Sequence, residues 1–340
     1  MDFAKASSEL TEQRRSVGFD SYDITIKQLV SMVGHDEINI APEYQRHFVW
    51  DDVRQSQLIE SLYLGIPVPS LFMATNEDAT WEVVDGLQRL TTLLRFVEGV
   101  DEESLKLRGL EKLSSLNGAV FSDLPQSLQL SLLTRPIRIT VLNDRSDHQV
   151  RFDLFERLNT GGIVLHEQEI RSCVFLGRFN DFVKSCASDE RVVKLVKRTD
   201  IRGRGNLEEL ILKFFAYFER SERFKHSVKD FLNEYMEEKT ISFKNEIELK
   251  RVFDRTFDFL CENLPNGIVR SDRPNTTPLL VFEAATVGVA CAIRDGALLD
   301  ATKLIETLDG ESLKKATSGG TNSQPKLRDR IDIVKKAVSN

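Results

Sequence analysis

Val84-Asp85-Gly86-Leu87-Gln88-Arg89 joins an apolar segment to an amphipathic one. We expect a buried strand over 81–84 and a helix from about residue 88 to residue 97. A strand that runs through Asp-Gly directly into a helix leaves the first amides of that helix unpaired and pointing at one spot. Together with the helix dipole, these amides form an anion site. Gly86 permits a sharp turn and close approach of a phosphate to the backbone.

Two charged side chains beside this turn extend the expected chemistry. Arg89, in the first turn of the helix, is suited to a forked, charge-assisted contact with phosphate. Asp85 would face the same space, where a carboxylate can hold Mg²⁺ or orient a water molecule. The alternative is structural: a hairpin or helix cap that carries a surface arginine. The turn by itself leaves both interpretations open.

The segments on either side of the turn predict an α+β fold. The elements expected nearby are a strand at 38–40, a helix from Asp51-Asp52 to Gly65, a strand at 70–75, a helix at 124–133 and a strand at 136–142. From residue 147 onward nearly every segment has helical spacing. We therefore expect a flexible N-terminal arm over 1–20, a mixed α/β domain over 21–175 and an all-helical domain over 176–340.

Length and charge limit the classes of protein to consider. A chain of 340 residues is long enough for two domains. Its net charge of -7 argues against a surface that is entirely a nucleic-acid footprint, although a local basic groove stays compatible with it. The sequence contains no apolar run of about 18 residues and begins without an apolar leader. These features predict a cytoplasmic protein without a membrane partner.

Two further clusters carry chemistry-bearing side chains. Tyr44-Gln45-Arg46-His47-Phe48-Val49-Trp50 sets aromatic rings beside a cation just ahead of a helix. The alternatives are a cation at a ligand site, or core aromatics next to a solvated arginine. Phe155-Glu156-Arg157-Leu158-Asn159-Thr160-Gly161-Gly162 suits a helix C-cap, or a polar loop whose amides and Asn159 close over a ligand.

In this order and spacing, the three clusters resemble the N-terminal domain of GmrSD-type restriction endonucleases, the DUF 262 family. The resemblance covers about residues 20–175 and includes Leu165, Glu169, Ile170 and Arg171. It implies a ParB/sulfiredoxin-like fold that binds or hydrolyses a nucleoside triphosphate with Mg²⁺, or binds DNA. It also implies nucleotide hydrolysis that governs a DNA-cutting module in prokaryotic anti-phage defence.

The family's motif carries over residue by residue. Asp85, Gly86, Gln88 and Arg89 match its Asp-Gly-Gln-Gln-Arg motif, so the resemblance assigns catalysis to Asp85, Gln88 and Arg89, with Asp85 as the Mg²⁺ ligand. Nucleotide binding falls to the residues Arg46, Gly86, Arg89, Asn159 and Gly161. The chain departs from the family at Leu87, where Gln is usual. If that Gln orients a water, hydrolysis is weakened here; if it packs inward, the change is neutral.

The second half of the chain differs from family members that end in a His-Asn-His nuclease. The five histidines are dispersed, and only His226 lies beyond residue 175. Such a nuclease centre needs paired His or Asn ligands in one compact unit, so we expect this chain not to be a nuclease itself. A basic run with Arg198, Arg202 and Arg204 is either a DNA-contacting loop or a solvated connector.

The leading interpretation is a regulatory subunit that binds, and in one version hydrolyses, a nucleoside triphosphate. Two alternatives stay open: a non-enzymatic module that binds or senses DNA, and a scaffold for a separate nuclease subunit. Assembly into a homo-oligomer is compatible with all three. The sequence contains no Walker motif, so a P-loop enzyme is not expected.

Overall fold

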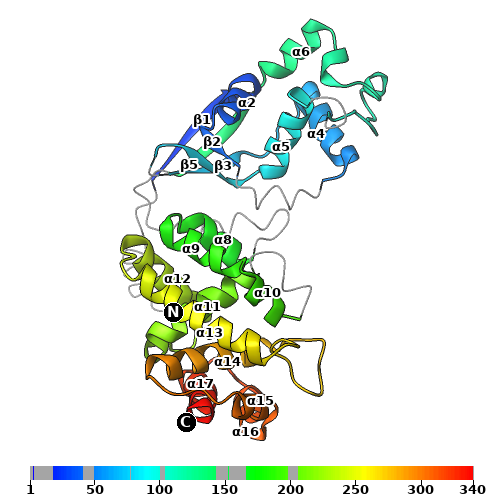
Figure 1. The fold of residues 1–340 in the computed structure, drawn as a ribbon. Helices are drawn as coiled ribbons and strands as arrows, with labels where there is room; N and C mark the ends of the chain where they lie inside the picture. Colours follow the sequence, from blue (N-terminus) through cyan, green and yellow to red (C-terminus); the bar gives the residue numbers. More distant parts are fainter. Residues whose placement is uncertain are drawn as a thin grey trace. The chain divides into compact units, whose positions relative to one another are not determined.

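The computed structural model describes residues 18–40, 50–76, 78–99, 104–142, 166–197 and 206–339, together with Phe3 and Phe152. The chain divides into two compact units, Met1–Gly161 and Gly162–Asn340. The first unit contains the described strands, and the second is helical (Figure 1). This confirms a mixed α/β first part followed by a helical second part.

Within the described part of the first unit, five strands form one mixed sheet in the order β1-β5-β3-β4-β2. The strands are β1 (Phe19–Thr25), β2 (Ile38–Asn39), β3 (Leu71–Thr75), β4 (Trp81–Asp85) and β5 (Pro136–Leu142). β1 pairs antiparallel with β5, from Phe19 opposite Leu142 to Thr25 opposite Pro136. β3 lies parallel to β5 and antiparallel to β4, and β2 is parallel to β4. Because β3 and β4 are antiparallel, the end of β4 lies beside the start of β3, with Asp85 opposite Phe72.

The sheet is strongly curved. The rings of Tyr22 on β1 and Trp81 on β4 stack with their centroids 5.6 Å apart, although β5 and β3 lie between those two strands in the sheet. Neighbouring strands are about 4.8 Å apart, so a flat sheet would hold these rings well beyond contact. A register shift between Phe72 and Met73 bends β3 near the start of the strand, where it pairs with Asp85.

The helices of the first unit build its core around the sheet. They are α2 (Ile26–Gly34), α4 (Asp52–Leu64), α5 (Leu87–Val97) and α6 (Gln126–Leu133), with short 3₁₀ turns η2 (Ser114–Leu116) and η3 (Phe121–Asp123). Asp51 caps α4 by accepting a hydrogen bond from the amide of Arg54 at 2.8 Å, and Gly65 ends it in the left-handed region. Ile59, Leu90 and Leu93 are among the side chains buried in this core.

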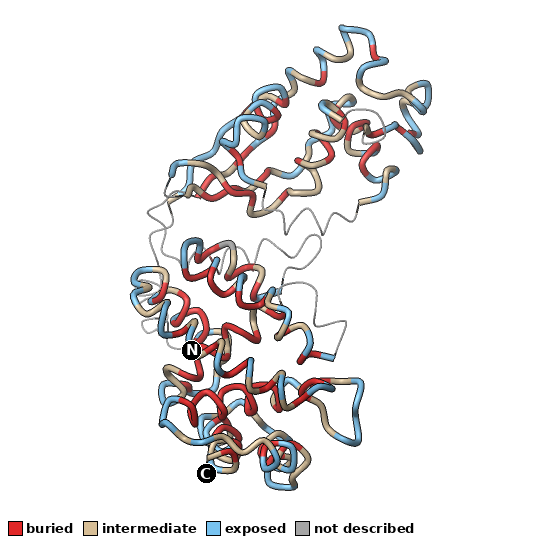
Figure 2. The backbone as a smooth tube through the Cα atoms, viewed as in Figure 1, coloured by how far each residue is buried: buried red, intermediate tan, exposed pale blue. Residues whose placement is uncertain are grey.

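The second unit is a helical assembly built around one apolar helix. Its helices are α8 (Glu167–Val174), α9 (Arg178–Ala187), α10 (Glu190–Leu195), α11 (Asn206–Arg220), α12 (Val228–Ile241), α13 (Glu246–Asn263), α14 (Leu279–Arg294), α15 (Ala301–Asp309), α16 (Glu311–Ala316) and α17 (Gln324–Val338), with the 3₁₀ turn η6 (Ser221–Arg223). Every residue of α14 from Val281 to Ile293 is buried, and the helix packs against α11, α13 and α17 (Figure 2). Apolar residues all around a helix are typical of such a central position.

Phenylalanine fills much of the space around α14. The rings of Phe214, Phe253 and Phe257 meet edge to face or tilted, with centroids 4.4–6.4 Å apart. Phe215 and Phe231 are buried as well. Offset and edge contacts of this kind stabilise aromatic pairs beyond the area they bury. These side chains are therefore core, whereas Phe259 on α13 is only half-buried.

Charged side chains also bind the helices of this unit to one another. Arg171 on α8 is fully buried and pairs with Glu209 on α11 at 3.1 Å. Lys213 lies between Glu209 at 2.8 Å and Glu283 on α14 at 3.8 Å. Arg330 on α17 completes the series by pairing with Glu283 at 2.7 Å. This chain of alternating charges crosses four helices.

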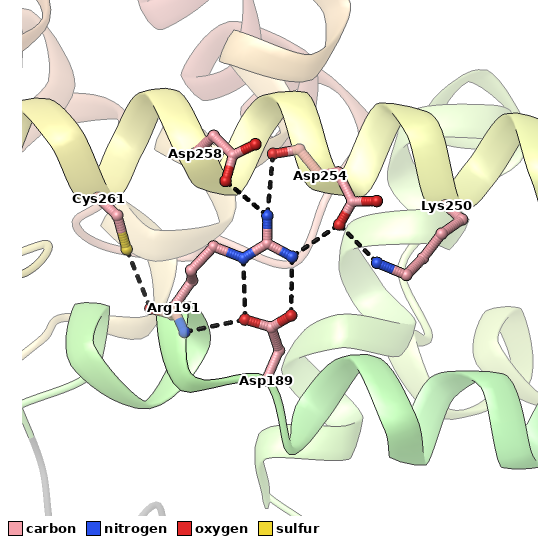
Figure 3. A network of polar contacts seen from close by, with 6 residues as sticks. All are labelled: Asp189, Arg191, Lys250, Asp254, Asp258 and Cys261. Carbon is pink, nitrogen blue, oxygen red and sulfur yellow. Dashed lines mark hydrogen bonds and ion pairs between the residues drawn. The ribbon is translucent and has the colours of Figure 1, made fainter.

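A second ionic cluster joins α10 to α13 (Figure 3). Arg191 donates to Asp189 through two guanidinium nitrogens and also pairs with Asp254 and Asp258 at 2.6 and 2.7 Å. Lys250 pairs with Asp254 at 2.5 Å. The cluster fixes a helix of only six residues against a long one.

Candidate functional site

The junction between β4 and α5 has the geometry that the Asp-Gly motif predicts. Gly86 lies in the left-handed region with φ +99°, and α5 begins at the next residue. A Cβ at this position would overlap Cδ2 of Leu71, a core residue of β3. The amide of Leu90 makes the first helical bond, to the carbonyl of Gly86 at 2.9 Å, and no side chain caps this end of α5. The junction is therefore a sharp, glycine-dependent turn with an uncapped helix start.

Arg89 does not project freely from this turn. Its Nη2 binds Oδ2 of Asp85 at 2.7 Å, and its Nη1 donates to the carbonyls of Ser70, at 3.0 Å, and Pro69. Only 13% of its side chain is exposed, and burial lowers the pKa of Arg89 against the opposing effect of the Asp85 carboxylate. The guanidinium thus links the start of α5 to the residues just before β3. These contacts were not predicted from the sequence.

Asp85 is the more accessible partner of this pair. Its side chain is 36% exposed, and Arg89 holds one of its oxygens, Oδ2. In the described ranges, no group of three or more His, Cys, Asp or Glu side chains is arranged to hold a metal ion. A single carboxylate still fits Mg²⁺, because this ion commonly takes one or two protein carboxylates and completes its shell with water and phosphate oxygens.

Gln88 brings the aromatic cluster to the same helix. Its Oε1 accepts a hydrogen bond from the amide of Trp50 at 3.1 Å, and Gln55 on α4 donates to the carbonyl of Trp50 at 3.0 Å. Gln55 is 1% exposed and in turn accepts from Arg95 at 3.2 Å. The last residue of the Tyr44–Trp50 cluster is therefore fixed against the first turn of α5.

Leu87, the position where the chain departs from the family motif, packs against the hydrophobic core of the first unit. Its side chain is partly buried rather than open to the turn.

Sequence reasoning missed a polar face of α4 that supports this region. Asp52 pairs with Arg95 at 2.7 Å and with Arg108 at 3.0 Å. Glu60, 9% exposed, accepts the amides of Lys112 and Leu113 at 2.8 Å each. The signal was present in the sequence: polar residues at 52, 55, 56 and 60 follow helical spacing within one helix. Such a row of polar residues on one face of a helix predicts side chains that bind neighbouring segments of the chain.

The third cluster, Phe155 to Gly162, lies outside the described residues, whereas two of the family positions that follow it are described. Arg171 is fully buried, and its Nε donates to Asn233 at 2.9 Å. Glu169 accepts the amide of His166 at 2.7 Å and so caps α8. These two residues are structural in the second unit. The site residues predicted at Arg46, Asn159 and Gly161, and the basic run at Arg198, Arg202 and Arg204, lie outside the described residues and stay predictions.

Residues 26–176 match a family model described as the GmrSD restriction endonuclease, N-terminal domain. This confirms the resemblance, and this stretch of the chain is a domain of that family. The match begins at the first residue of α2 and ends just beyond α8, whereas the two compact units divide at Gly161. No curated protein and no solved structure matches the chain. Among the described residues, no helix is long and apolar enough to cross a membrane.

Proposed function

We propose that residues 26–176 form a ParB/sulfiredoxin-like domain that binds a nucleoside triphosphate at the start of α5. In this proposal the chain is a regulatory subunit of a restriction-type anti-phage system and acts with a separate nuclease subunit on DNA. The family match supports the cellular role. The observation that carries the site is the uncapped start of α5, which follows a left-handed glycine and lies beside an accessible carboxylate.

The described geometry gives the residues of the motif different tasks. The first amides of α5 bind the phosphates, and Gly86 lets those phosphates approach the backbone. Mg²⁺ held by Asp85 would neutralise phosphate charge there. Arg89 orients Asp85 from its buried position, and Gln88 sets the position of Trp50. Arg46, Asn159 and Gly161 are the proposed contacts from the neighbouring segments.

Hydrolysis at such a site would rest on positioning and electrostatics. Phosphoryl transfer needs an aligned water and stabilised charge and does not require a covalent protein nucleophile. Asp85 is the proposed residue for holding the metal and orienting the water. Retained turnover is part of the proposal because Asp85, Gln88 and Arg89 all match the family motif.

The sharpest test compares Asp85→Asn with Glu98→Gln in the full-length chain. Both changes neutralise a carboxylate on or next to α5, but Glu98 lies at the exposed opposite end of that helix. We would measure phosphate release and equilibrium binding for each of four nucleoside triphosphates with Mg²⁺. Asp85→Asn should lower both by at least about tenfold, the loss expected for one metal or charge-assisted contact. Glu98→Gln should leave both unchanged.

Arg89→Ala is a poor functional probe because Arg89 also holds the carbonyls of Pro69 and Ser70. A loss of activity in that variant would not distinguish a damaged site from a damaged turn. If the wild-type chain binds no nucleotide, or if both carboxylate variants lose binding equally, the proposal is wrong. A DNA-sensing module or a scaffold for the nuclease would then explain the domain better.

A further inference from the structure

The loop between α13 and α14 forms a small basic cavity in the second unit. Arg270 and Arg273 pair in an isolated bridge, with the amide of Arg273 bound to the carbonyl of Arg270 at 3.0 Å. Together with Thr317, which follows α16, and the first residues of α14, these arginines line a cavity of about 300 Å³. This volume is at the lower end of the range for small-molecule sites, so it suits one compact group.

Arg270 is oriented into this cavity with unused donors. Its Nη2 donates to Oγ1 of Thr317 at 2.7 Å, and that hydroxyl is itself fixed by donating to the carbonyl of Leu313 at 2.7 Å. The Nε of Arg270 is shielded from solvent and has no acceptor. The Nη1 of Arg270 makes no hydrogen bond among the described residues, so it is the donor left for a ligand in the cavity.

A second arginine and a helix end reinforce the positive field. Within the described residues, Arg273 has no carboxylate partner. α14, 16 residues long, begins after Pro278 with no side-chain cap and no acidic residue in its first turn. The amides of Leu279 and Leu280 make none of the backbone hydrogen bonds seen among the described residues. Both residues line the cavity.

Two carboxylates belong to this region: one is on the loop itself, and the other binds the loop from α15. Asp272 lines the cavity but is exposed, so solvent and salt screen its repulsion. Asp309 is committed to the loop backbone, because its Oδ1 accepts the amide of Ser271 at 2.9 Å. With two arginines and one carboxylate, the lining of the cavity keeps a net positive charge.

We propose that this cavity binds a phosphate group. Two arginine forks and a helix start offer donors from three directions, which matches the several oxygens of a tetrahedral anion better than the two oxygens of a carboxylate. The cavity, about 300 Å³, accommodates a phosphate group. The phosphate comes either from a polynucleotide backbone or from a free phosphate. This site lies in the second unit and does not depend on the proposed nucleotide site at Asp85.

The test titrates inorganic phosphate into the full-length chain by calorimetry at low ionic strength. The variants are Arg273→Gln and Arg270→Gln, with Arg251→Gln as the control, because Arg251 is an exposed arginine of α13 outside the cavity. Arg273 is exposed, so its replacement carries little risk to the fold. Each cavity variant should weaken phosphate binding by about tenfold, and the control should leave it unchanged. The same comparison in an Asp85→Asn background excludes phosphate bound at α5.

A second arm identifies the source of the phosphate with a short duplex DNA followed by fluorescence anisotropy over a range of salt. If the phosphate belongs to a polynucleotide, each cavity variant should weaken DNA binding and reduce the salt slope by about one. If DNA affinity is independent of both arginines while phosphate binding needs them, the site takes free phosphate. Absence of phosphate binding by the wild type, or an equal loss in Arg251→Gln, would overturn the proposal.

Discussion

Gly86 is constrained both by its backbone conformation and by the close packing around it, and two glycine substitutions separate these effects. Its φ of +99° disfavours any side chain, and a Cβ would also overlap the buried side chain of Leu71. Gly118 has a similar φ of +93°, but a Cβ there would meet nothing within 4 Å. Gly118→Ala should therefore cost only the backbone strain, about 1–2 kcal/mol. Gly86→Ala should cost about 1–3 kcal/mol more, because the core around Leu71 must also shift.

Urea unfolding of the two variants beside wild type measures this difference. Nucleotide binding by Gly86→Ala, assayed where the variant is still folded, should also weaken, since the added methyl group lies at the proposed phosphate approach. Equal destabilisation of the two variants would contradict this prediction. It would show that Leu71 moves aside without a cost in unfolding free energy.

At the residue scale, the sequence predicted the backbone better than the side-chain partners. Asp-Gly between an apolar strand and an amphipathic segment is a local signal, and the turn at Gly86 follows from it. The partners of Arg89 are carbonyls at Pro69 and Ser70, about twenty residues earlier in the chain. Only the register of β3 beside β4 brings them into reach, and no local pattern encodes that register.

At the element scale, the Arg191 cluster predicts a defined dependence of stability on pH. Hydrogen bonds from Arg191 lower the pKa of Asp189. Burial alone would raise the pKa of Asp254, but the bonds from Lys250 and Arg191 outweigh it, so this pKa is lowered too. Both carboxylates thus have a lower pKa when folded than when unfolded. Their contribution is complete above the unfolded pKa of about 4 and is lost as the pH falls through the folded values.

Arg191→Gln should remove this contribution. Because the side chains of Asp254 and Asp258 are 37% and 57% exposed, solvent screening limits the expected loss at neutral pH to about 1–2 kcal/mol. The difference in unfolding free energy between wild type and variant should stay constant from neutral pH to about pH 5 and shrink below about pH 4. Denaturant unfolding at several pH values measures it, with Arg255→Gln, at an exposed arginine of α13, as control. A difference that persists at low pH would exclude the ionic explanation.

Three elements that were not predicted lack a clear local pattern, for two different reasons. β1 exposes its first five residues as the edge strand of the sheet, so it lacks the alternation that identifies a half-buried strand. Its first residues, Phe19 and Asp20, fall within the stretch expected to be a flexible arm. α10 and α16, six residues each, are too short to show a period. The long helices α11, α13, α14 and α17 lie in the part of the chain predicted to be helical, where each repeats its pattern over several turns.

At the scale of the whole molecule, each unit has a core of its own. The first buries the apolar side chains of its sheet and helices, and the second is built around α14. The family match extends past the division between the units and includes α8, whose Arg171 is buried in the second. The expected boundary near residue 175 was set by the last motif of the family resemblance. The division at Gly161 is set by contacts between distant parts of the chain, which no local pattern predicts.

Separate cores predict that damage to one unit is confined to it. Arg330 is 2% exposed and pairs at 2.7 Å with Glu283, which is 5% exposed. Arg330→Met leaves that carboxylate buried with only Lys213, 3.8 Å away, so we expect a loss of about 3–5 kcal/mol. Hydrogen exchange of the full-length variant should speed up in α14 and α17 and stay unchanged in β3, β4 and α5. Gly86→Ala should give the reverse pattern. Faster exchange in both units of either variant would show that the two cores unfold as one cooperative structure.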